Sequence, residues 1–235
     1  MKLFGRLSHF KALIFGKQNK PLVSEPPSQS MGEFNAQLRA AIEGDKYAMT
    51  KILANGNNVS AQFDLGWMYY NGEGVSKDLA LAASWFREAA EQGHAGAQYN
   101  LGYMYANGEG VYKDSALAVS WYRNAAEQGD ADAQFNLGMK YLSGDGVSQD
   151  SVLAAGWLRK AAEQGLVPAQ CNLGAIIEAG DGVLKDLVAA YMWRNLAAAQ
   201  GDRSAVLGRN ALEKIMTPAQ IAEAQKLSRE WTPKK

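Results

Sequence analysis

The sequence AQYNLGYMYANGEGV, residues 97–111, decides the fold of this chain because it returns at a fixed spacing of 36 residues. Its copies are AQFDLGWMYYNGEGV at 61–75, AQFNLGMKYLSGDGV at 133–147 and AQCNLGAIIEAGDGV at 169–183. The copies align without a gap, and so do the residues that follow them. A fixed period of about 20 to 50 residues is typical of a solenoid, in which each unit buries its apolar surface against its neighbours. The chain is therefore predicted to be an array of stacked repeats.

Each repeat contains the signals for two helices joined by a short turn. In the copy quoted, the first helix runs from about Ala97 to Asn107 and ends at Gly108, which can adopt the positive φ that ends a helix. The second helix begins after Asp114, whose carboxylate can accept a backbone N–H of the first turn, and it ends near Gly129. No segment shows the alternation of apolar and polar residues that is expected of a strand. The fold class is therefore predicted to be all-α.

Three further columns of the repeat predict how the helices pack. Glycine recurs in the middle of the first helix, where it costs about 0.8–1.0 kcal/mol relative to alanine, so we expect another helix to approach closely there. A leucine and the tyrosine four residues after it should face the interior, and the tryptophan of each second helix should belong to the core. The columns are Gly66, Gly102, Gly138 and Gly174; Leu65–Tyr69, Leu101–Tyr105 and Leu137–Tyr141; and Trp85, Trp121, Trp157 and Trp193.

The repeat resembles that of a known family. The residues from Ala97 to Asp114 read A-Q-[YF]-N-L-G-x-x-Y-x-x-G-x-G-V-x-x-D, and those from Ala118 to Gly129 read A-x-x-W-[YF]-x-x-A-A-x-Q-G. This pattern is similar to the Sel-like repeat (SLR) family, relatives of the tetratricopeptide repeats, and the match covers about 61–204. The resemblance implies a right-handed α/α superhelical solenoid of 36-residue helix-turn-helix repeats. It also implies a non-enzymatic adaptor that holds other proteins, with no cofactor and no chemistry common to the family.

The regions outside the four full repeats extend the predicted array at both ends. We expect residues 1–32 to be a basic leader with a proline-rich linker, and residues 33–231 to form the solenoid. Within the solenoid, 33–60 resembles a degenerate opening unit, 61–204 holds the full repeats, and 205–231 resembles a terminal half-repeat with a capping helix. That last helix has its own start signal, because Thr217 and Gln220 can form a capping box around Pro218.

The resemblance also predicts which side chains face a partner, since the first helices of tetratricopeptide units line the inner, concave surface. By register these side chains fall at i, i+4, i+7 and i+8, on a single stripe. The stripe varies between repeats while the framework does not, and it is aromatic at one end, which suits an apolar or amphipathic peptide. In the alternative interpretation, some of these side chains merely pack between adjacent first helices. The candidate groove residues are Phe63, Trp67, Tyr70, Asn71, Tyr99, Tyr103, Asn107, Phe135, Met139 and Leu142, and the stripe also contains Ala106, Ser143, Cys171, Ala175, Glu178 and Ala179.

The sequence predicts no catalytic, cofactor or metal site. The turns do carry an acidic column, which consists of Glu73, Glu109, Asp145 and Asp181. Packed helices stand about 8–10 Å apart, however, so these carboxylates are too far from one another to share an ion that needs oxygens at about 2.3–2.6 Å. The G-x-G of each turn follows a helix and lacks the third glycine of a nucleotide fingerprint. His9 and His94 are the only histidines, so a metal or acid–base centre built on histidine is not expected.

An enzyme is the alternative to a scaffold. Some Sel-like proteins are described as binding or hydrolysing β-lactams, and the resemblance therefore leaves open an enzyme or small-ligand binder of the β-lactam-associated type. The one S-x-x-K sequence runs from Ser8 to Lys11, and no S-D-N or K-T-G follows it. A non-enzymatic scaffold that binds a protein or peptide partner in its groove is the favoured function.

The charges balance overall but are unevenly distributed. The chain has 24 basic and 24 acidic residues, which argues against a general nucleic-acid binder. Lys2 and four further bases precede the first acid, Glu25. As a helix, residues 2–15 would be basic and amphipathic and could contact an anionic membrane surface, bind a partner or act as a targeting signal; a disordered leader without function is the alternative. No apolar run is long enough to span a bilayer, so we expect a cytoplasmic protein. Cys171 is the only cysteine, so no intramolecular disulfide is expected.

Overall fold

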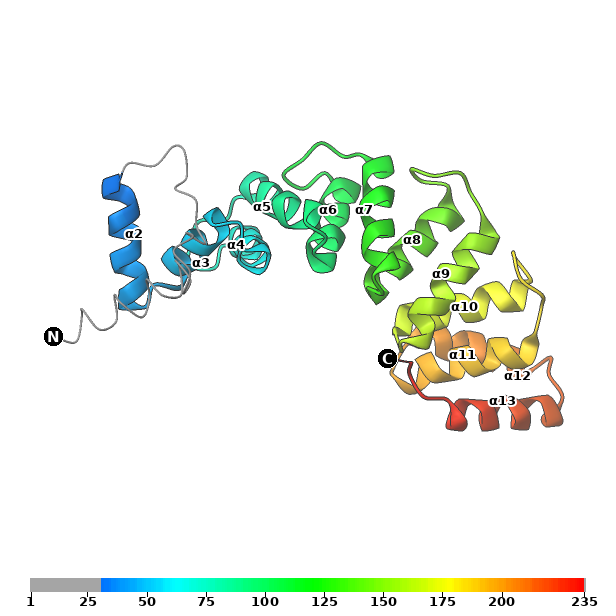
Figure 1. Ribbon diagram of the computed structural model, residues 1–235. Helices are drawn as coiled ribbons and strands as arrows, with labels where there is room; N and C mark the ends of the chain where they lie inside the picture. The colour runs from blue at the N-terminus through cyan, green and yellow to red at the C-terminus, as the bar shows by residue number, and fades with distance from the viewer. Residues whose placement is uncertain (1–30, 235) are drawn as a thin grey trace. The chain divides into compact units, whose positions relative to one another are not determined.

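The structure is a computed structural model that describes residues 31–234. This part of the chain contains twelve helices and no strand (Figure 1), so the predicted all-α solenoid is confirmed. No helix within it has the length and apolar character needed to cross a lipid bilayer. The basic segment 2–15 and the S-x-x-K sequence from Ser8 to Lys11 lie outside the described residues.

The described chain forms two compact units, residues 31–113 (unit 1) and residues 114–234 (unit 2). Unit 1 contains α2 (Met31–Glu43), α3 (Lys46–Asn55), α4 (Val59–Asn71), α5 (Leu79–Glu91) and α6 (Ala95–Asn107). Unit 2 contains α7 (Ser115–Glu127), α8 (Ala131–Ser143), α9 (Ser151–Glu163), α10 (Val167–Ala179), α11 (Leu187–Ala199), α12 (Arg203–Glu213) and α13 (Pro218–Glu230). Within each unit successive helices pack on one another up to α12, and α13 packs on α11 (Figure 1).

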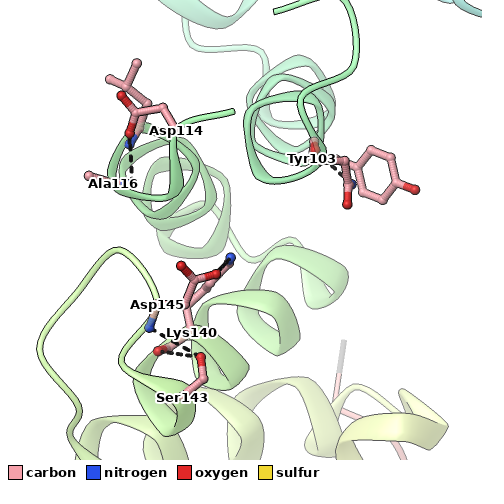
Figure 2. Close-up of polar contacts among 8 residues, drawn as sticks. Tyr103, Asp114, Ala116, Lys140, Ser143 and Asp145 are labelled. Atoms are coloured by element: carbon pink, nitrogen blue, oxygen red, sulfur yellow. Dashed lines mark hydrogen bonds and ion pairs between the residues drawn. The ribbon is translucent and has the colours of Figure 1, made fainter. Parts of the chain in front are cut away.

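Caps at both ends fix the length of each helix, as the sequence predicts. Asp114 accepts the backbone N–H groups of Ala116 and Leu117 at 3.0 and 2.9 Å (Figure 2), and the same type of cap opens the other second helices. The first helices end at a left-handed glycine, with a φ of 74° at Gly108. Thr217 forms the predicted capping box at the start of α13. These contacts satisfy backbone groups that have no partner inside the helix, so the helix ends are determined locally.

In three of the four G-x-G turns, the second glycine sets the spacing of successive repeats. A Cβ built on Gly146 would lie 2.2 Å from the carbonyl oxygen of Ser115, the first residue of the preceding second helix. The equivalent pairs are Gly110 with Leu79 and Gly182 with Ser151. Because the neighbouring atoms are backbone, they cannot move aside as the end of a side chain can. The turn of one repeat therefore rests directly on the helix of the repeat before it.

The glycine column of the first helices makes room for the core, as the sequence predicts. A Cβ on Gly66 would lie 2.7 Å from the ring of Phe86, and one on Gly138 would lie 2.8 Å from Cγ of Leu158. Phe86 and Leu158 are completely buried. The leucine column is also completely buried and consists of Leu65, Leu101, Leu137 and Leu173. The absence of a side chain on one helix thus lets the next helix insert a large one.

The predicted tryptophan core is wrong for three of its four members. Trp85, Trp121 and Trp157 are half-buried, and only Trp193 is buried. The side chain that fills the core belongs instead to the following residue, namely Phe86, Tyr122 or Leu158. The mid-helix glycine faces that following position, so the tryptophan is displaced to the edge of the interface.

A column of buried glutamines ties three consecutive helices together. Gln134 in α8 donates to the carbonyl oxygen of Ala126 in α7 at 3.1 Å and accepts from Gln164, at the end of α9, at 2.9 Å. The same bonds join Gln170 to Ala162 and Gln200, and Gln62 to Ala54 and Gln92. Leaving a buried amide unpaired costs about 1–3 kcal/mol, so this column positions the helices relative to one another. The sequence carries the signal as the recurring A-Q and Q-G pairs.

Candidate partner-binding surface

The structure places the predicted stripe differently in the two units. In unit 1, Trp67 and Tyr103 are 41% and 37% exposed. Asn71 and Asn107 are exposed as well, while Phe63, Tyr70 and Tyr99 are half-buried. These seven residues of unit 1 are called the aromatic surface below. In unit 2, the stripe residues Phe135, Met139 and Leu142 are half-buried and pack against the hydrophobic core.

Four rings of unit 1 lie in a row with nearly parallel planes. The ring centroids of His94 and Phe63 are 4.5 Å apart, with 20° between the planes. Phe63 and Trp67 follow at 6.5 Å and 21°, and Trp67 and Tyr70 at 5.9 Å and 16°. The last three rings share one face of α4 because they are spaced four and three residues apart. Contacts on both sides hold the Trp67 ring in place while leaving a large part of it exposed.

Tyr70 ends this row and connects two repeats. Its hydroxyl donates to Oε2 of Glu109, in the turn after α6, at 2.8 Å. The ammonium group of Lys77 lies 5.6 Å from the centroid of the Tyr70 ring, within the range of a cation–π interaction. Burial, followed by the hydrogen bond to Glu109 and its charge, raises the pKa of Tyr70 to about 12. The hydroxyl therefore remains a hydrogen-bond donor at neutral pH.

Tyr103 occupies the same column as Trp67, one repeat further along the chain. Figure 2 shows its ring projecting away from α6. The side-chain amide of Asn107 donates to the backbone oxygen of Tyr103 at 3.0 Å, which holds the amide against the helix. An exposed ring with a fixed polar group one helical turn away is the combination found at many protein interfaces.

The equivalent positions of unit 2 have a different chemistry. Met139 replaces the exposed aromatic residue, and Leu142 replaces the tyrosine at the end of the row. Lys140 forms an ion pair with Asp145 in the following turn (Figure 2). The acidic position of this turn is thus neutralised from within its own repeat, and the stripe presents methionine and leucine instead of aromatic rings.

The fourth repeat contains a charged pair that the sequence analysis did not identify. Arg194 stands in the column that elsewhere holds Phe86, Tyr122 and Leu158. Its guanidinium pairs with the carboxylate of Glu178, and its side chain is only 13% exposed. A Cβ on Gly208 in α12 would overlap the guanidinium, so the glycine provides the space that the arginine occupies. The signal was an arginine in an otherwise apolar column.

The described residues bring together no group with obvious catalytic geometry. No three His, Cys, Asp or Glu side chains in 31–234 are arranged to hold a metal ion. Nδ1 of His94 accepts the backbone N–H of Ala97 at 3.1 Å, so this imidazole is the N-cap of α6. Burial, reinforced by Asp202, raises the pKa of the Cys171 thiol, which disfavours the reactive thiolate.

Comparisons with known proteins agree with this architecture. The model of the Sel1 repeat matches residues 59–94, 95–130, 131–166 and 167–202. The chain is similar to the Sel1 repeat protein from Oxalobacter formigenes, with 33% identity, a TM-score of 0.68, and coverage of 84% of this chain and 85% of that one. It is also similar to c5321, a protective antigen of uropathogenic Escherichia coli strains with an SLR fold, with 35% identity, a TM-score of 0.71, and coverage of 97% of this chain and 53% of c5321. None of the curated proteins gives a significant match.

Proposed function

Because this chain belongs to the Sel1 repeat family, we propose that it is a non-enzymatic scaffold that binds a peptide segment of a protein partner on the aromatic surface of unit 1. Proteins of this family are typically interaction scaffolds. The exposure of Trp67 and Tyr103 is the observation that carries the proposal. The two rings occupy equivalent positions of successive repeats, and each is accessible to a partner.

The rigidity and the contact area of the aromatic side chains favour binding of a peptide. Tyrosine and tryptophan provide a large contact area with few rotatable bonds, so they lose little conformational entropy on binding and dominate many interfaces. Trp67 is already fixed between Phe63 and Tyr70. The exposed amides of Asn71 and Asn107 provide a polar rim. The half-buried stripe of Phe135, Met139 and Leu142 in unit 2 is proposed as a second, weaker contact, because packing against the core already uses part of its area.

A quantitative capture experiment tests the proposal. The full chain, the double variant Trp67→Ala with Tyr103→Ala, and a control variant are each used to capture proteins from a lysate, and the bound proteins are compared by mass spectrometry. Tyr112→Ala is the matched control, because Tyr112 is another aromatic residue of unit 1 and is 97% exposed, but it lies in a turn outside the stripe.

We expect a partner that the parent chain and the control retain equally and that the double variant loses by tenfold or more, since two hot-spot truncations typically cost about 2 kcal/mol or more. Circular dichroism of the double variant should match that of the parent chain, which shows that the loss is local. Equal recovery of every partner by the double variant would mean that the aromatic surface is not the binding site.

A further inference from the structure

The charges around the aromatic surface are mostly acidic. The helices α4 and α6 contain neither lysine nor arginine, and their one charged side chain is Asp64, exposed one helical turn before Trp67. Each of the turns that follow these helices adds a glutamate, Glu73 or Glu109, and a lysine, Lys77 or Lys113, besides the aspartate that caps the next helix. Acids therefore outnumber bases around the aromatic surface, which combines electron-rich rings with carboxylates.

No ion pair among residues 31–234 neutralises the carboxylates of Asp64, Glu73 and Glu109. In unit 2, by contrast, the acid at the position of Glu109 is Asp145, which is paired with Lys140. The negative charge of the unit 1 surface is thus available to a partner.

The rings themselves favour a cation. An aromatic ring carries a negative face that attracts a cation placed over it, and the attraction is stronger when the pair is shielded from water. The ammonium of Lys77 already lies over the ring of Tyr70. The hydrogen bond that Tyr70 donates to Glu109 adds electron density to that ring. Trp67, whose ring has the most favourable π-system for this interaction, remains exposed beside it.

On the basis of the proposed function, we propose that the aromatic surface of unit 1 selects a basic peptide segment, with an arginine side chain of the partner stacked on Trp67 and the carboxylates of Asp64 and Glu109 as its counter-charges. Arginine fits better than lysine because its planar guanidinium can stack on a ring and bind carboxylates at its edge at the same time. Apolar side chains of the same segment occupy the remaining area around Tyr103.

Three fluorescein-labelled peptides test this selection by fluorescence anisotropy with the full chain. The peptides share their leucine and phenylalanine positions and carry arginine, glutamine or glutamate at all other positions. We expect the arginine peptide to bind about tenfold more tightly than the glutamine peptide, and the glutamate peptide to bind most weakly. Added salt should reduce the preference for arginine, because the carboxylates are partly exposed to solvent.

Substitutions in the aromatic surface and its carboxylates identify the side chains that select arginine. Asp64→Asn combined with Glu109→Gln should remove most of the preference for the arginine peptide over the glutamine peptide, because both substitutions keep the side-chain shape but remove the negative charge. Trp67→Ala should weaken binding of the arginine and glutamine peptides, and Tyr112→Ala should affect none.

The outcomes separate the two proposals. Equal affinity for the arginine and glutamine peptides, with both still weakened by Trp67→Ala, overturns the selection for a basic segment and leaves the proposed function standing. Failure of all three peptides to bind, or binding that Trp67→Ala does not change, overturns both.

Discussion

The hydroxyl of Tyr70 donates a hydrogen bond to the carboxylate of Glu109 at 2.8 Å, across 39 positions of the sequence. The bond joins the end of α4 to the turn after α6, and so connects the two repeats that carry the aromatic surface. It also fixes the ring that ends the row of Phe63 and Trp67. A single polar contact therefore links the repeat framework to the proposed binding surface.

The titration of Tyr70 tests this contact. Glu109→Gln should lower the pKa of Tyr70 from about 12 toward its ordinary value of 10.0, but not all the way, because burial remains. Absorbance of the tyrosinate ion, taken as the difference between each protein and its Tyr70→Phe derivative, measures this pKa. An unchanged titration in Glu109→Gln would exclude the negative charge of Glu109 as a cause of the shift.

The same shift predicts how stability depends on pH. The pKa of Tyr70 is higher in the folded than in the unfolded chain, so its stabilising contribution is complete below pH 10 and is lost as the pH rises through about 12. Urea unfolding should show a free energy of unfolding that falls less steeply over this range in Tyr70→Phe than in the parent chain. Equal slopes would contradict the prediction.

The close approach of α8 and α9 predicts opposite effects for two glycine substitutions. Gly138→Ala should destabilise unit 2 by about 1–3 kcal/mol, because its Cβ would lie 2.8 Å from Leu158 and 3.2 Å from the backbone oxygen of Ala154. Gly156→Ala, on the open side of α9 with no atom within 4 Å, should stabilise by up to about 1 kcal/mol through helix propensity alone. Thermal and urea unfolding measure both. Two changes of the same sign would show that α9 does not depend on the missing side chain of Gly138.

The contact between successive repeats predicts that alanine destabilises the protein more at one turn glycine than at another, although both glycines have a positive φ. Gly129 has a φ of 98° and open space around it, whereas Gly146 has a φ of 80° and faces the backbone of Ser115. Gly129→Ala should cost about 1–2 kcal/mol for the left-handed backbone, and Gly146→Ala should cost clearly more because it adds a collision with backbone. The free energy of unfolding of the two variants tests this. Equal losses would mean that backbone conformation alone requires both glycines.

The pair of Arg194 and Glu178 predicts that the double substitution is better tolerated than the single one. Glu178→Leu should destabilise by about 1–3 kcal/mol, because it leaves a mostly buried guanidinium without its counter-charge, and the exposure of the carboxylate limits the loss. The third repeat has a leucine, Leu158, at the position of Arg194. Adding Arg194→Leu should therefore restore the free energy of unfolding to the parent level or above. Differential scanning calorimetry of both variants decides the matter. A double variant less stable than the single one would show that the pair is a net source of stability.

A structural feature could be predicted from the sequence where the residues that cause it and the structure that they form both lie within one repeat. Asp114 and Gly108 mark helix ends by local chemistry, and the glycine column predicted the close helix contacts. The positions of the stripe follow from the register, but their exposure does not. The register assigned Trp67 and Met139 to the same column, yet only neighbouring helices determine that the first is exposed and the second packs against the core.

The repeat, the all-α fold and the register of the stripe that we propose as the binding surface follow from the sequence, because a period of 36 residues repeats the same local interactions in every copy. The tertiary structure alone decided which side chain fills the core, since the glycine of one helix faces the residue after tryptophan and not the tryptophan itself. It also decided where charge is left unpaired. An ion pair depends on the distance between side chains from different helices and turns, and that distance exists only after the helices have packed.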